Sequence, residues 1–110
     1  MDGESLYRQY LLGEKTAFDG IVELYRENLI FFINRYTGDL DAAEDLSQDA
    51  FLELLLHPKR YDFRVSLKTY LFTIARNKAF NYLKKRGRIV YSDEETAERS
   101  EEYRSFEQEM

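Results

Sequence analysis

The sequence predicts an all-α protein: a compact bundle of three main helices, with a short helix before them and an acidic tail after them. Apolar residues recur at the spacing of a helix face through most of the chain, and no segment alternates apolar and polar residues as a strand would. Most glycines and the single proline fall between these periodic segments, where helices end. With 110 residues, the chain is long enough for one domain with one modest core.

The first half of the chain predicts a short helix followed by a long one. The short helix covers about residues 5–12 and ends at Gly13. The long helix covers residues 18–36, where apolar side chains keep the helical period for about five turns, and Gly38 stops it. Gly20 lies inside this helix, where it costs about 1 kcal/mol relative to alanine.

The second half predicts two further helices and the tail. Asp39 or Asp41 can cap the third helix, which ends near Leu56 because Pro58 follows. Residues 57–65 have no sustained period and are expected to form a loop, after which Ser66 caps a fourth helix that runs to about residue 85. Residues 91–110 form an acidic segment that opens with a capping-box pattern.

Charge is strongly segregated along the chain, although the formal net charge is only −5. Residues 1–56 carry 12 acidic and 4 basic residues, net −8, and residues 57–90 carry 1 acidic and 10 basic residues, net +9. Residues 91–110 carry 8 acidic and 2 basic residues, net −6. This asymmetry predicts two partners of opposite charge, or a basic surface guarded by the acidic tail.

Composition and motifs argue against several classes of protein. The absence of cysteine excludes disulfides and thiolate metal sites, and the longest apolar run is far too short to span a membrane. The polar, acidic N-terminus is unlike a signal peptide, so we expect a cytoplasmic protein. The only histidine, His57, stands at a helix end, and no phosphate loop or nucleophile motif occurs, so neither catalysis nor a cofactor is predicted. A metal-dependent enzyme built on the acidic third helix is an alternative, but that helix has no ligating histidine partner.

The basic block interleaves cations with aromatic rings. Cations neutralise phosphates and rings stack on unpaired bases, so this composition favours binding of single-stranded nucleic acid. The simpler interpretation is that many of the rings are core residues and the lysines a solvated face. Tyr61 and Phe63 favour nucleic-acid binding, because they lie in a loop where burial is less automatic.

The third helix carries a polar row along one side. The row consists of residues at positions i, i+3, i+4 and i+8, namely Asp45, Gln48, Asp49 and Glu53. Such a row is usually an ordinary solvated face. It is also suited to docking a basic protein partner, because charge complementarity sets orientation and association rate.

Two runs of sequence, DAAEDLSQDAFLELL and LKTYLFTIARNKAFNYLKKRGR, closely resemble the second conserved region of bacterial RNA polymerase sigma factors. The match is to the extracytoplasmic-function type of the sigma-70 family and covers about residues 16–88, including the upstream run AFDGIVELYRENLIFFINRYTGD. Each run alone is weakly specific, whereas the two together at the correct separation are specific. The resemblance implies a helical domain over residues 1–90 and, in residues 91–110, the start of a linker toward a C-terminal helix-turn-helix domain that this chain lacks.

The resemblance also implies two roles. The third helix is expected to dock on the coiled coil of the polymerase β′ subunit, through Glu44, Asp45, Gln48, Asp49, Phe51 and Glu53. The loop and the fourth helix are expected to recognise and melt the promoter −10 element by holding its single-stranded non-template strand. The residues expected to contact this DNA are Lys59, Arg60, Tyr61, Phe63, Arg64, Ser66, Lys68, Tyr70, Arg76, Asn77, Lys84, Lys85 and Arg88.

Two interpretations of the function stay open. The first is a non-catalytic promoter-recognition and polymerase-binding domain, with an anti-sigma factor as a further expected partner and no membrane association. The alternative is a sigma-like interaction module that binds polymerase or an anti-sigma regulator without reading DNA. We also hypothesise that the acidic tail folds over the basic face as an autoinhibitor.

Overall fold

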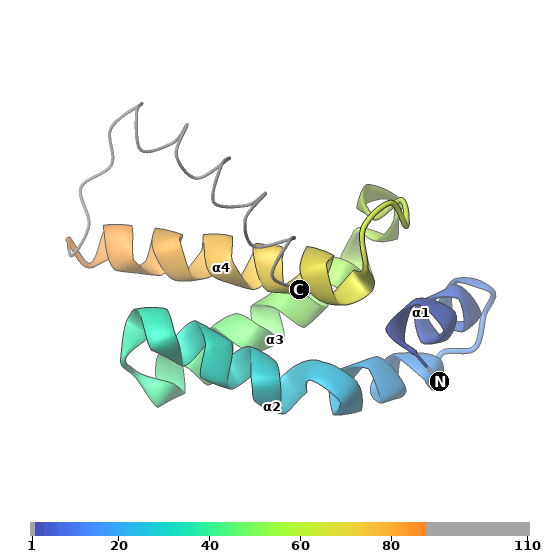
Figure 1. Cartoon of the computed structure of the whole chain (residues 1–110), viewed down its shortest axis with the longest axis horizontal. Coiled ribbons are helices and arrows are strands. Elements are labelled where there is room, and N and C mark those ends of the chain that lie inside the picture. Colours follow the sequence, from blue (N-terminus) through green and yellow to red (C-terminus); the bar gives the residue numbers. More distant parts are fainter. Residues whose placement is uncertain (1, 88–110) are drawn as a thin grey trace.

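A computed structural model of the chain describes residues 2–87 and shows a helical bundle (Figure 1). Its helices are α1 (Gly3–Leu11), α2 (Ala17–Thr37), α3 (Leu40–Leu56) and α4 (Leu67–Lys85), with a short 3-10 helix, η1 (Pro58–Arg60), between the last two. The described part of the chain contains no strand, and the predicted all-α fold is confirmed. The acidic tail over residues 91–110, and the hypothesis that it covers the basic face, lie outside the described residues.

The four helices begin and end within two residues of the predicted positions, and side-chain caps explain where three of them start. Asp2 Oδ1 accepts a hydrogen bond from Ser5 N at 2.7 Å, so α1 begins earlier than expected. At the start of α3 the cap is Asp39 rather than Asp41, since Asp39 Oδ1 accepts from Ala42 N at 3.2 Å. As predicted, Ser66 caps α4, with Oγ accepting from Thr69 N at 3.0 Å.

The core lies where α2, α3 and α4 pack against one another, and α1 extends it at the N-terminal end of α2 (Figure 1). The apolar stripes predicted from the sequence supply its fully buried residues, including Ile21 and Leu29 of α2, Leu54 of α3, and Leu67 and Leu71 of α4. Burying one such side chain contributes about 1.5–3 kcal/mol. α1 adds Tyr7, whose side chain is completely buried.

Two glycines have clear structural roles in α2. Gly38 has a φ of 64°, a left-handed conformation in which its N–H donates to Asn34 O at 2.9 Å and closes the helix. Gly20, which the sequence suggests is only a weakness, faces α1. A Cβ at this position would lie 3.2 Å from the methyl carbons of Leu6, so glycine lets the two helices approach closely.

No helix within residues 2–87 combines the length and the apolar character needed to cross a membrane.

Candidate protein and nucleic-acid interfaces

The polar row on α3 is exposed at its N-terminal end and engaged at its C-terminal end. Asp45, Gln48 and Asp49 are exposed, as the helical spacing predicts. Glu53 is half-buried, and its Oε1 lies 3.7 Å from Lys78 Nζ of α4 and 4.0 Å from Arg60 Nη1 of η1. The carboxylate of Glu53 therefore ties α3 to neighbouring elements, whereas the other three side chains face solvent.

The remaining α3 residues expected to meet a polymerase are less accessible. Phe51 is buried and belongs to the core, with only 6% of its surface exposed. Glu44 is half-buried, and its backbone carbonyl accepts a hydrogen bond from Ser47 Oγ at 2.8 Å. Neither residue stands out from the surface in the way that Asp45 does.

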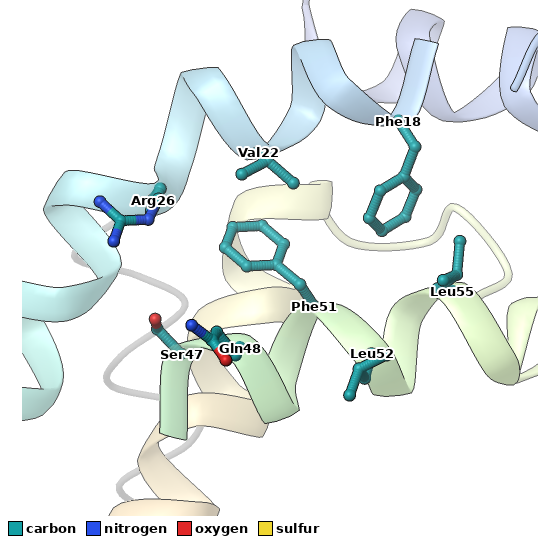
Figure 2. A pocket seen from close by; sticks show the side chains of 8 residues that line it. All are labelled: Phe18, Val22, Arg26, Ser47, Gln48, Phe51, Leu52 and Leu55. Atoms are coloured by element: carbon teal, nitrogen blue, oxygen red, sulfur yellow. The ribbon is translucent and has the colours of Figure 1, made fainter. Parts of the chain in front are cut away.

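An apolar groove runs between α2 and α3 beside the polar row (Figure 2). It has a volume of about 330 Å³, and Gln48 belongs both to its wall and to the polar row. Figure 2 shows Phe18 and Val22 reaching from α2 toward the ring of Phe51 on α3. Leu52 on the rim is 47% exposed. This side of α3 thus offers a row of acidic and amide groups next to an open apolar surface.

The loop between α3 and α4 is fixed by α1, through a hydrogen bond that Pro58 makes necessary. The carbonyl of Leu54 lies in the last turn of α3, where the usual donor would be the N–H four residues on. That residue is Pro58, which has no N–H. The hydroxyl of Tyr7 donates to Leu54 O instead, at 2.7 Å in a buried position. Burial raises the pKa of Tyr7 to about 12, so the phenol stays protonated as a donor.

Tyr61 is buried, so the expectation that its loop position leaves the ring open is wrong. Only 5% of its surface is exposed, and its ring lies 4.9 Å from that of Tyr70 and 5.9 Å from that of Tyr7. Its hydroxyl donates to Val65 O at 2.6 Å. Burial, with a further contribution from the charge of Glu4, raises the pKa of Tyr61 to about 12. The loop is long enough to fold one of its own rings into the core.

Phe63, in the same loop, has an unusual backbone conformation. Its φ of 68° lies in the left-handed region, which a bulky side chain rarely adopts. Asp62 holds the turn, because Oδ1 accepts from Arg64 N at 3.1 Å and Oδ2 lies 3.2 Å from Arg64 Nε. The half-buried ring packs 4.6 Å from that of Tyr61, and the guanidinium carbon of Arg8 lies 3.9 Å from its centre.

The cations predicted to contact DNA divide into exposed and buried groups. Those whose side chains face solvent are Lys59, Arg60, Arg64, Lys68, Lys84 and Lys85, and the amide of Asn77 is exposed as well. Arg76 is buried, with 7% of its surface exposed, and its guanidinium carbon lies 4.5 Å from the centre of the Phe80 ring. Arg76 is thus placed as a packing residue, and the expectation of an open α4 cation at this position is wrong.

Three further predicted DNA contacts have other placements. Ser66 is exposed, but its hydroxyl is occupied as the cap of α4. Tyr70 is half-buried against Tyr61, and burial raises its pKa. Arg88 lies outside the described residues.

Sequence reasoning missed the contribution of α1 to this loop. Glu4 accepts a hydrogen bond from Leu67 N, at the first turn of α4, where a carboxylate also meets the positive end of the helix dipole. Together with Tyr7 and Arg8, it gives α1 three contacts within little more than one helical turn, at both ends of the loop and with Phe63 inside it. The only signal in the sequence is Pro58, which predicts an unpaired carbonyl but not its donor.

Within residues 2–87, no three histidine, cysteine or acidic side chains converge as metal ligands would. The acidic residues of α3 are spread along the helix.

Comparison with known proteins identifies the family. The sequence model of Sigma-70 region 2 matches residues 21–89. The ECF RNA polymerase sigma factor SigW of Bacillus subtilis (strain 168) is 29% identical over 90 residues, which cover 82% of this chain and 48% of that protein. The RNA polymerase sigma-H factor of Pseudomonas aeruginosa is 32% identical over 98 residues, covering 89% and 51%. The ECF RNA polymerase sigma factor SigM of Bacillus subtilis (strain 168) is 32% identical over 74 residues, covering 67% and 45%.

The chain spans about half the length of these curated relatives. The matched residues include all of α3, the loop and α4, which carry the acidic and the basic surfaces. With this match and these relatives, the chain belongs to the sigma-70 region 2 family, within the ECF type of RNA polymerase sigma factors.

Proposed function

We propose that this chain binds core RNA polymerase and recognises and melts the promoter −10 element during transcription initiation. Family membership supports the proposal, because the relatives are named RNA polymerase sigma factors. The observation that carries it is the separation of two surfaces of opposite charge on one small bundle. Asp45, Gln48 and Asp49 face solvent from α3, whereas exposed cations follow the loop and α4. In this proposal the domain covers residues 1–90, acts in the cytoplasm and performs no chemical step.

The polymerase-binding surface is the polar row of α3 with the groove beside it. A basic coiled coil, as expected from the β′ subunit, would place its cations along Asp45 and Asp49 and an apolar side chain in the groove next to Leu52. The charged row would set orientation and association rate, and the groove would add apolar contact area. An anti-sigma factor of similar chemistry could compete for the same face. Glu53 is expected to contribute little, because its carboxylate already faces Lys78 and Arg60.

The DNA-binding surface is the loop with the exposed side of α4. Lys59, Arg64 and Lys68 are available to backbone phosphates of the non-template strand. Phe63 and Tyr70 are half-buried and keep part of their rings accessible, whereas Tyr61 supports them from inside. Taking a base out of the stack costs a few kcal/mol, which stacking and charge contacts on this surface must offset.

A charge-reversal experiment tests the polymerase-binding surface. Asp45→Arg with Asp49→Arg should abolish binding to purified core polymerase, because both substitutions repel a basic partner. The control is Glu23→Arg with Glu27→Arg, which makes the same charge change at the same i, i+4 spacing on exposed positions of α2. Binding is measured by fluorescence anisotropy of the labelled chain, and folding by circular dichroism. Equal affinities for the two double variants would refute the assignment of α3.

A selection experiment tests DNA reading. The 110-residue chain is incubated with a randomised single-stranded DNA pool and with the same pool as duplex, and bound molecules are sequenced. A sequence motif enriched only in the single-stranded pool is expected, with binding that weakens as salt rises. Polymerase binding without any enriched motif would favour an interaction module that does not read DNA.

A further inference from the structure

Arg8 lies in the acidic part of the sequence but is placed at the basic loop. Residues 1–56 have a net charge of −8, and the basic block begins only at residue 57. In the folded chain the guanidinium carbon of Arg8 is 3.9 Å from the centre of the Phe63 ring. A planar cation at this distance stacks on the ring, which holds the guanidinium in one position. The fold therefore adds to the loop a cation that the charge pattern does not predict.

α1 presents Arg8 rigidly because it is attached at both ends of the loop. Tyr7 donates to the carbonyl of Leu54 before the loop, and Glu4 accepts from the N–H of Leu67 after it. Arg8 follows Tyr7 directly, so its backbone is fixed by a residue that is completely buried. A side chain on a fixed backbone loses less conformational freedom when it binds a ligand.

Within residues 2–87, Arg8 has no carboxylate within ion-pair distance, and its charge interacts with that of Asp2 over a longer distance. Nearby, Arg64 pairs with Asp62 and Arg60 approaches Glu53, but no described carboxylate forms an ion pair with Arg8. The side chain is exposed, and one face of its guanidinium rests on Phe63. A guanidinium placed over a ring can still donate from its N–H groups to an outside acceptor, and phosphate is the acceptor that matches this fork of donors.

The backbone conformation of Phe63 positions its ring for the contact with Arg8. A bulky residue is strained at a φ of 68°, and such conformations persist where surrounding contacts impose them. Here Asp62 fixes the turn and the rings of Tyr7 and Tyr61 support the Phe63 ring. In this conformation the ring of Phe63 lies beneath the guanidinium of Arg8.

We propose that Arg8 is a further DNA-binding residue, whose guanidinium, supported by Phe63, binds a backbone phosphate of the single strand held by the loop. Arg8 precedes the residues matched by the family, which begin at 21. The inference rests on the proposed function, since it needs single-stranded DNA at the loop. It assigns α1 a direct part in binding in addition to its packing role.

The test compares Arg8→Gln with a control, Arg35→Gln. The control removes the same charge from an exposed position in the last turn of α2, whereas α1 packs against the first turns of that helix. Binding of the 110-residue chain to its selected single strand is measured over a range of salt concentrations. Arg8→Gln should bind about fivefold more weakly at 0.1 M salt, and its slope of log K against log salt should be smaller by about 0.7, the value for one lost phosphate contact on a single strand. Arg35→Gln should keep the slope of the parent chain.

A second variant, Arg8→Lys, separates charge from packing. Lysine keeps a phosphate-binding charge but not the flat stack on Phe63, so the parent salt slope should be retained with a smaller loss of affinity. A parent-like slope in Arg8→Gln, or a slope in Arg8→Lys reduced as far as in Arg8→Gln, would overturn the proposal. If the parent chain binds no single strand, the proposed function itself fails and takes this inference with it.

Discussion

The polar row on α3 and the loop between α3 and α4 are both surfaces of one bundle, but they are built differently. The row is local: helical spacing alone turns Asp45, Gln48 and Asp49 toward solvent. The loop is non-local, because its conformation depends on Tyr7 and Glu4, more than 45 residues earlier in the chain. Local surfaces can be predicted from sequence residue by residue, whereas a surface shaped by distant partners cannot.

Pro58 shows where the difference begins. In the interior of a helix each carbonyl accepts from the N–H four residues on, and only the carbonyls of the last turn need a partner from elsewhere. At Leu54 the proline removes that donor, so a residue from another helix must supply it. The loop therefore carries core residues and contacts from α1, and substitutions in it should affect stability far more than substitutions in the row.

The largest difference in stability is expected between Tyr61→Ala in the loop and Gln48→Ala in the polar row. Tyr61→Ala should lower the free energy of unfolding by about 3–5 kcal/mol, because it removes a buried ring from the core. Gln48→Ala, on the exposed row, should change it by no more than about 0.5 kcal/mol. Urea denaturation followed by circular dichroism measures both. Similar midpoints for the two variants would show that Tyr61 is not a core residue in solution.

Alkaline pH should destabilise the fold through the buried tyrosines beside the loop, whereas the polar row contains no tyrosine to ionise. The pKa values of Tyr7 and Tyr61 are about 12 in the folded chain, against the usual 10, mainly because burial disfavours the charged phenolate. Their contribution to stability is therefore complete below pH 10 and is lost as the pH rises toward 12. Tyrosinate absorbance and circular dichroism should change together in this window. Ionisation of all tyrosines near pH 10, with no change of fold, would contradict the burial of both rings.

Tyr7→Phe tests the hydrogen bond at the proline. The variant keeps the buried ring but leaves the carbonyl of Leu54 without a donor, which should cost about 1–3 kcal/mol of unfolding free energy. Tyr10→Phe is the control, because the Tyr10 ring stacks on that of Tyr7 and its hydroxyl bonds to no described residue. Chemical denaturation of both variants gives the comparison. Equal losses would mean that the hydroxyl of Tyr7 contributes nothing specific.

Glu53→Gln, at the boundary between the two regions, should lower the free energy of unfolding less than Tyr7→Phe does. Its contacts with Lys78 and Arg60 are 3.7 and 4.0 Å long and partly exposed, so losing them should cost less than about 1 kcal/mol. The cost should shrink as salt rises. Polymerase affinity should change less than in Asp45→Asn, which removes the same charge from an exposed position. A larger loss of affinity in Glu53→Gln than in Asp45→Asn would show that Glu53 contributes more to polymerase binding than Asp45 does.

Local sequence patterns predicted the all-α fold, the four helices within residues 2–87, the apolar stripes that form the core and the exposed part of the polar row. These features depend on helical period and on caps such as Ser66, which act over a few residues. The same reasoning located the loop, but it misjudged the burial of Tyr61 and Arg76 and gave α1 no role. A loop has no period from which the burial of Tyr61 could be inferred, and Arg76 lies on α4, where its positive charge favoured a solvent-facing position that packing against Phe80 overrides.

Packing between distant segments selects which partners meet across the chain. It places Tyr61 inside the core, brings the hydroxyl of Tyr7 to the carbonyl that Pro58 leaves unpaired, and sets Arg8 over the ring of Phe63 in the basic loop. The physical reason is that buried polar groups must find donors or acceptors wherever the fold provides them. The position of Pro58 in the sequence shows that such a partner is needed, and only packing selects which residue it is.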